Sequence, residues 1–92
     1  MAEKNVHALV SGKVQGVFFR DYTKSEAERL GVSGWVRNKR DGSVEVFISG
    51  KADKVDQMVN WLYQGSPTSR VSGVKANTVE KDPGLIGFQI RH

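Results

Sequence analysis

The sequence predicts an α+β fold in which strands and helices follow the order β-α-β-β-α-β and both helices cover one face of a sheet. Three observations lead to this prediction. The chain has 92 residues, the size of one domain. Several segments alternate apolar and polar residues with the period of a strand, and two others repeat apolar residues at helical spacing. Between the two middle strands lies Asp41-Gly42, a dipeptide typical of a hairpin turn.

The first strand is predicted at Asn5–Ser11, where apolar side chains alternate with others. A loop bracketed by Gly12 and Gly16 follows, and the first helix runs from about Asp21 to Leu30. Asp21 in the first turn suits the helix dipole, and Gly31 is a suitable C-terminal cap. The apolar positions near helical spacing are Phe19, Thr23 (through its methyl group), Ala27 and Leu30.

The middle of the chain predicts a hairpin and a second helix. Strands are expected at Val32–Asn38 and Ser43–Ser49, joined by the turn Lys39–Gly42. The second helix spans about Ala52–Gln64 and is followed by Gly65. Its apolar stripe, at positions i, i+3, i+4 and i+7, consists of Val55, Met58, Val59 and Leu62.

The last third of the sequence predicts a fourth strand and has room for one short extra strand. The fourth strand covers about Val71–Val79, and Asp82-Pro83-Gly84 forms a turn after it. The short extra strand can form at Ile86–Arg91. Together these elements give the ferredoxin-like split β-α-β arrangement, with an antiparallel sheet of four to five strands and two helices on one face. Residues 1–92 are expected to form this single domain.

Composition narrows the function classes. The chain has no cysteine, which excludes disulfides, cysteine-ligated metal sites and thiolate nucleophiles, and its two histidines show no metal-ligand spacing. The formal net charge of +4 favours anionic partners without choosing among them. No apolar run approaches the roughly 20 residues of a membrane span, and the polar N-terminus lacks a signal sequence. We therefore expect a soluble, cytoplasmic, monomeric protein.

The predicted topology brings two distant segments together. A helix crosses over between the first and second strands, so these strands run in the same direction and end at the same edge of the sheet. The loop 12–20 follows the first strand, and Asn38 ends the second. Glycines in such a loop let backbone amides point inward as an anion-binding nest, beside a helix N-terminus and the guanidinium of Arg20. Taken alone, the two glycines and the arginine favour a tight turn with a solvated arginine over a phosphate site, because short glycine motifs often match by chance.

Two longer strings sharpen the interpretation. G-K-V-Q-G-V-F-F-R at 12–20 and G-W-V-R-N-K-R-D-G-S-V-E-V-F-I-S-G at 34–50 resemble the two signatures of the acylphosphatase family, in the same order and at compatible spacing. The resemblance covers the whole chain. It implies an enzyme that hydrolyses the carboxyl–phosphate anhydride of acyl phosphates to a carboxylate and inorganic phosphate, with no metal or organic cofactor.

The resemblance also implies site residues. Arg20 would bind the phosphoryl group, and Asn38 would orient the attacking water. Backbone amides of the first signature would cradle the phosphate, at Gln15, Gly16, Val17, Phe18, Phe19 and Arg20. Lys39 and Arg40, which follow the asparagine, are expected to be a solvated turn.

No general base is expected near this site, because His7 lies on the first strand and His92 is the last residue. An acyl phosphate does not require one: its leaving group is a carboxylate, and its phosphoryl transition state is loose. Positioning and charge stabilisation would supply most of the rate. The partner is thus expected to be a small acyl phosphate, with neither nucleic acid nor membrane.

Two other classes of function remain open at this point. The same architecture hosts RNA-binding domains, but those place aromatic side chains on the central strands, whereas here the paired Phe18 and Phe19 lie in a loop. Acylphosphatase-like modules also serve as accessory domains of larger proteins. Salt-dependent nucleic-acid binding would favour the first alternative, and a tight protein partner the second.

Overall fold

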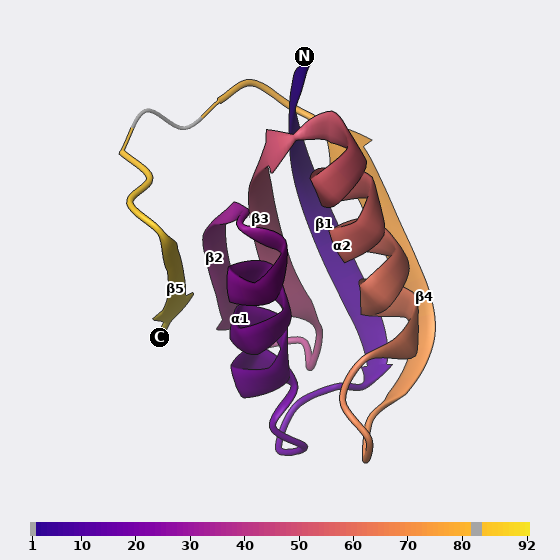
Figure 1. The fold of residues 1–92 in the computed structure, drawn as a ribbon. Coiled ribbons are helices and arrows are strands. Elements are labelled where there is room, and N and C mark those ends of the chain that lie inside the picture. Colours follow the sequence, from indigo (N-terminus) through magenta and orange to yellow (C-terminus); the bar gives the residue numbers. More distant parts are fainter. Residues whose placement is uncertain (1, 82–83) are drawn as a thin grey trace.

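The structure is a computed structural model that describes residues 2–81 and 84–92. The predicted order of helices and strands is confirmed (Figure 1). The elements are β1 (Glu3–Lys13), α1 (Phe19–Leu30), β2 (Ser33–Asn38), β3 (Val44–Lys51), α2 (Ala52–Gln64), β4 (Arg70–Thr78) and β5 (Phe88–Arg91). Of the turn expected at Asp82-Pro83-Gly84, the first two residues lie outside the described residues. Neither described helix is long and apolar enough to cross a bilayer.

The strands form one sheet in the order β4-β1-β3-β2-β5. Pairing is antiparallel except between β2 and β5, which run parallel, so the expectation of a purely antiparallel sheet was wrong in this detail. The reason is geometric. The strand β5 lies at the opposite edge from β4 and begins at the end of the sheet where β4 finishes, so it takes the direction of its neighbour β2 (Figure 1).

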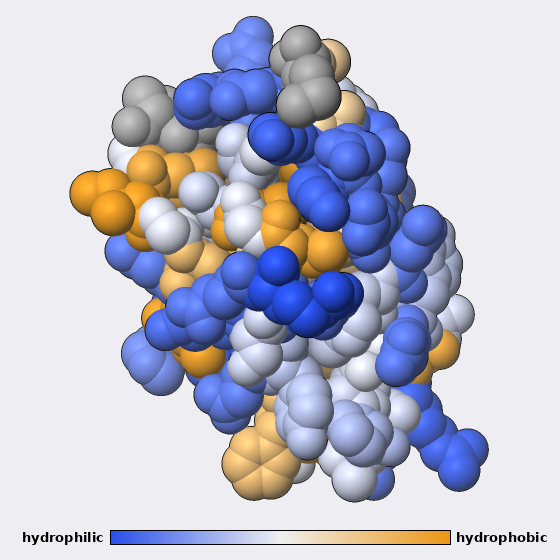
Figure 2. Space-filling model, in the orientation of Figure 1, coloured by the Kyte–Doolittle hydropathy of each residue, from blue (hydrophilic) through white to orange (hydrophobic). Residues whose placement is uncertain are grey.

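Both helices pack on the same face of the sheet, and the core lies between these two layers (Figure 1). The predicted period of β3 is confirmed, since Val44, Val46 and Ile48 point into the core and are fully buried. The stripe of α2 meets them with Val55, Met58 and Leu62, which are equally buried. Seen from the helices, the surface is mostly hydrophilic, with hydrophobic residues in separate areas (Figure 2).

The first helix begins at Phe19, two positions before the predicted start at Asp21. Tertiary packing explains the difference. The ring of Phe19 is 1% exposed and lies 5.8 Å from the ring of Trp61 on α2, so the helix is fixed at its first residue. Thr23, one turn further, is buried and donates its hydroxyl to the Phe19 carbonyl at 2.6 Å. The start of α1 is thus held against the core.

The other face of the sheet carries no helix and is covered by its own side chains. Trp35 on β2 stacks on Phe47 of β3 with ring centroids 6.1 Å apart, and the guanidinium of Arg91 lies 4.9 Å from the Trp35 ring. Beside them Glu45 accepts hydrogen bonds from Arg37 and from His7, the latter at 2.6 Å. Burial opposes ionisation of Glu45, but these two partners outweigh it and hold the pKa of its carboxyl below the usual value.

A glycine allows β2 and β3 to approach closely. Gly34 has φ 149°, and a Cβ at this position would lie 1.8 Å from the Phe47 carbonyl oxygen. We expect Gly34→Ala to lower the free energy of unfolding by more than about 2 kcal/mol, and Tm by roughly 8 °C or more. Gly73→Ala on β4 is the matched control, because its Cβ would only touch Ser11 Oγ at 3.5 Å. Thermal denaturation measures both, and equal losses would contradict the steric explanation.

The ion-pair cluster predicts a pH dependence of stability. Because the folded-state pKa of Glu45 is lowered, the carboxylate stabilises the fold above its unfolded pKa, near 4.3, and this contribution is lost as the pH falls through the folded pKa. We expect Glu45→Gln to cost about 1–2 kcal/mol at pH 7, with the difference from wild type shrinking below about pH 4. Urea denaturation from pH 3 to 7 measures this. Glu28→Gln, at an exposed position on α1, serves as control, and a pH-independent deficit in Glu45→Gln would argue against the ionic origin.

Candidate active site

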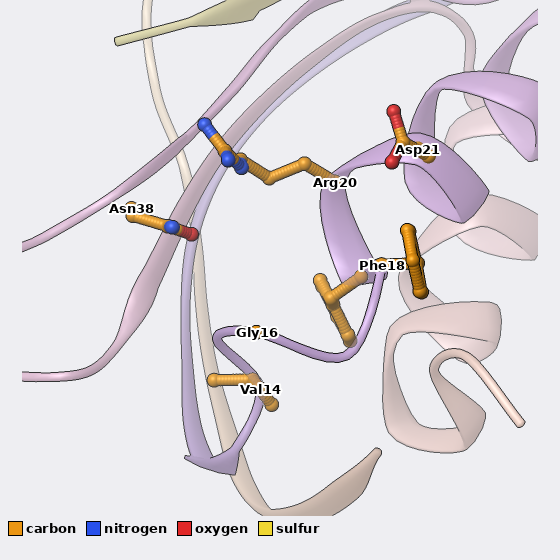
Figure 3. Close-up of a pocket in the computed structure, with 7 residues that line it drawn as sticks. Val14, Gly16, Phe18, Arg20, Asp21 and Asn38 are labelled. Atoms are coloured by element: carbon orange, nitrogen blue, oxygen red, sulfur yellow. The ribbon is translucent and has the colours of Figure 1, made fainter. Parts of the chain in front are cut away.

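A cavity of about 290 Å³ lies where β1 gives way to α1 and β2 ends (Figure 3). The topology therefore brings together the segments that the sequence predicted to meet. Arg20 reaches from the first turn of α1 toward Asn38 at the end of β2, and the loop at Gly16 lies beside them (Figure 3). The residues around the cavity are Val14, Gly16, Phe18, Phe19, Arg20, Asp21 and Asn38.

The loop exposes a row of backbone amides. Gly16 and Phe18 both have left-handed backbone conformations, with φ 73° and 58°. The first backbone hydrogen bond at the start of α1 runs from the Tyr22 amide to the Phe18 carbonyl, at 3.1 Å. Among the described residues, no amide from residue 15 to residue 20 donates to another protein group. These amides and the positive end of α1 form a cluster of donors without protein acceptors.

The loop is anchored from the side of α2. Ser66 is buried and donates its hydroxyl to the Val17 carbonyl at 2.7 Å, and Thr68 donates to the same oxygen at 3.4 Å. No sequence pattern assigned a role to this hydroxyl-rich segment after α2. Its role depends on a contact across 49 residues, which no local pattern reveals.

Gln15 ties the loop to the β2–β3 hairpin. Its side-chain amide donates to the carbonyls of Lys39 at 2.7 Å and Ser43 at 2.8 Å. Sequence reasoning considered only the backbone amide of this residue. The side chain fixes the distance between the loop and the turn that follows Asn38.

Asn38 presents a polar atom that the protein leaves unpaired. Its Oδ1 is buried and has no hydrogen-bond partner among the described residues. Unsatisfied buried oxygens are rare in folded proteins, and this one adjoins the cavity. A carboxamide oxygen here can accept a hydrogen bond from a water or a substrate hydroxyl.

The guanidinium of Arg20 has no carboxylate partner among the described residues. Its Nη1 instead lies 3.5 Å from Nδ1 of His92. Its place at the end of the sequence was the reason for not expecting His92 near the site, and that reason was wrong. Because β5 runs parallel to β2, its end reaches the same edge of the sheet as Asn38, and only the pairing of β5 could have revealed this.

Asp21 lines the cavity, but its side chain lies on the other side of the α1 N-terminus from Arg20 and Asn38 (Figure 3).

A second hollow, of about 600 Å³, shares Asn38 and is bordered by Lys39, Arg40 and Asp41. The hydroxyl of Ser43 and, with a smaller effect, its backbone amide donate hydrogen bonds to Asp41 and lower the pKa of its carboxyl. The cations on this rim raise the local concentration of anions.

The arrangement suits a tetrahedral anion. Of the residues whose amides were expected to cradle a phosphate, Gly16, Phe18, Phe19 and Arg20 line the cavity, whereas Gln15 and Val17 do not. Unpaired amides, a helix N-terminus, a planar guanidinium and Asn38 thus adjoin one cavity. No group of three or more metal-ligating side chains occurs within 2–81 and 84–92.

Comparison with known proteins agrees with this geometry. The acylphosphatase family model matches residues 6–90. Acylphosphatase of Rubrobacter xylanophilus is 52% identical over 88 residues, which are 96% of this chain and 80% of that protein. Acylphosphatase of Pelotomaculum thermopropionicum is 42% identical over 98% of both chains. The crystal structure of acylphosphatase from Bacillus subtilis superposes with a TM-score of 0.92 at 31% identity, over 97% of this chain and 99% of that one. Since the match spans the core, the loop and the β2–β3 hairpin alike, the chain belongs to the acylphosphatase family.

Proposed function

We propose that the protein hydrolyses acyl phosphates, releasing a carboxylate and inorganic phosphate. One observation carries the proposal: Asn38, whose Oδ1 has no hydrogen-bond partner among the described residues, lines the same cavity as Arg20 and the loop residues Gly16 and Phe18. This cavity combines an acceptor that can hold a water with donors that can hold a phosphoryl group.

The loop and Arg20 bind the phosphoryl group in this proposal. The backbone amides of residues 15–20 surround the phosphoryl oxygens, and the fork of Arg20 donates to two of them. Both interactions strengthen as charge builds on the equatorial oxygens in the transition state. Gln15 and Ser66 act on this step indirectly, because they hold the loop in place.

Asn38 orients the attacking water. The water donates a hydrogen bond to Oδ1, and its oxygen attacks phosphorus while the bond from phosphorus to the acyl oxygen breaks. The electron pair leaves with the carboxylate, and a phosphoryl oxygen takes the proton of the water. A loose transition state and a good leaving group make this route possible without a protein base.

The unit of function in this proposal is the single domain of residues 1–92. One chain supplies the loop, Arg20 and Asn38, so we propose a monomer that needs no partner subunit. Because the chain has no cysteine, it has no disulfide bond that would require an oxidising compartment, which supports a cytoplasmic location.

Substitution of the two side chains tests the proposal. We expect Arg20→Ala and Asn38→Ala each to lower kcat for benzoyl phosphate by roughly 10²–10³, because each removes a group aimed at the transition state. Wild-type turnover should persist in EDTA. Asn60→Ala, at an exposed position on α2, is the matched control and should keep full activity. Circular dichroism verifies folding, and a folded wild type with no turnover above the spontaneous rate would refute the proposal.

The choice of substrate gives a second test. A phosphate monoester releases an alkoxide or phenoxide, which needs a general acid that this site does not supply. We expect kcat/KM for phenyl phosphate to be at least about a thousandfold below that for benzoyl phosphate. Phosphate release measures both rates. Comparable values would mean that a protein group protonates the leaving group, the candidates being Asp21, which lines the cavity, and His92, which contacts Arg20.

A further inference from the structure

Phe18 combines two features that packing alone does not explain. It is the one non-glycine among the described residues with a positive φ, 58°, a conformation that any Cβ disfavours. Its side chain is also 71% exposed, so burial of the ring does not offset this strain. An exposed aromatic ring on a strained backbone at the edge of a cavity points to a role outside the fold itself.

The in-line geometry of phosphoryl transfer predicts which part of the substrate the Phe18 ring would contact. The attacking and leaving oxygens lie on opposite sides of phosphorus. With the water on Asn38, the acyl group must leave on the side away from Asn38. Phe18 and Asn38 lie on opposite sides of Gly16 (Figure 3). The departing acyl group therefore faces the side of the cavity that Phe18 lines.

The surface continues beyond Phe18 with further aromatic side chains. Tyr22 follows four positions later, one helical turn along α1, and is 46% exposed. Tyr22 and Trp61 border a neighbouring hollow of about 370 Å³, whose Ser66 holds the Val17 carbonyl of the loop. An acyl group that extends past Phe18 thus meets the aromatic side chains of Tyr22 and Trp61, and on this side of the cavity the charged lining residue is Asp21.

We propose that Phe18 is a specificity-determining residue that contacts the acyl group, and that the site favours acyl phosphates with an aromatic or bulky apolar acyl group. This inference rests on the proposed function. An aromatic acyl group can stack on or pack edgewise against the ring, whereas an acetyl group is too short to gain much. The strain of the backbone at Phe18 is retained because it presents the ring at this edge.

The substitution Phe18→Asn separates the ring from the backbone. Asparagine tolerates the left-handed conformation and keeps the amide that faces the cavity. We expect the ratio of kcat/KM for benzoyl phosphate to that for acetyl phosphate to fall about three- to tenfold, mainly through KM for benzoyl phosphate. Dividing by the acetyl value removes any effect on the phosphate cradle. Relief of strain should raise Tm by about 4–8 °C.

Two controls and three outcomes complete the test. Tyr63→Asn removes another exposed aromatic ring, on α2, and should leave the ratio unchanged. Phe18→Leu keeps an apolar side chain in the strained conformation and should keep part of the preference without the gain in Tm. If the ratio stays unchanged in Phe18→Asn, whether both rates persist or both fall by the same factor, the role assigned to Phe18 is wrong but the proposed function stands. A folded wild type that hydrolyses neither substrate overturns the proposed function first.

Discussion

The side-chain amide of Gln15 donates to two carbonyls of the β2–β3 hairpin, and the geometry of the whole site depends on this link. The sheet places the ends of β1 and β2 at one edge, but β3 lies between them, so the strands themselves do not fix the loop against the hairpin. Gln15 spans this gap. Ser66 holds the same loop from the other side through the Val17 carbonyl. The cavity therefore has a definite shape before any substrate enters, which reduces the ordering that binding requires.

A site built in this way leaves several of its own groups unsatisfied. Among the described residues, the loop amides and Asn38 Oδ1 have no protein partner, and the Arg20 guanidinium has no carboxylate partner. Each orphaned group weakens the fold, and the compensation lies in the core and on the open sheet face. There Glu45, between His7 and Arg37, and the stacked Trp35 and Phe47 stabilise strands that no helix covers. Stability and reactivity thus occupy different regions of one small domain.

Much of this could be predicted from the sequence, because the signals were periodic or topological. Alternation gave the strands, the stripe of Val55, Met58 and Leu62 gave α2, and the crossover rule brought Arg20 near Asn38. The rest depends on single contacts between distant residues. The Gln15 and Ser66 hydrogen bonds, the position of His92 and the parallel pairing of β5 leave no periodic trace. The left-handed backbone of Phe18 also escaped prediction, since the residue type argues against it.

The place of β1 in the sheet has a consequence for how the protein is made. It leaves the ribosome before the two strands that pair with it, which are β3, from residue 44 onward, and β4, from residue 70 onward. Until those residues are synthesised, β1 has two unpaired edges, and closing such long loops is entropically slow. The loop that follows β1 can take its final shape only after Ser66 has emerged. The site at the end of β1 is therefore completed only after β3 and α2 have been made.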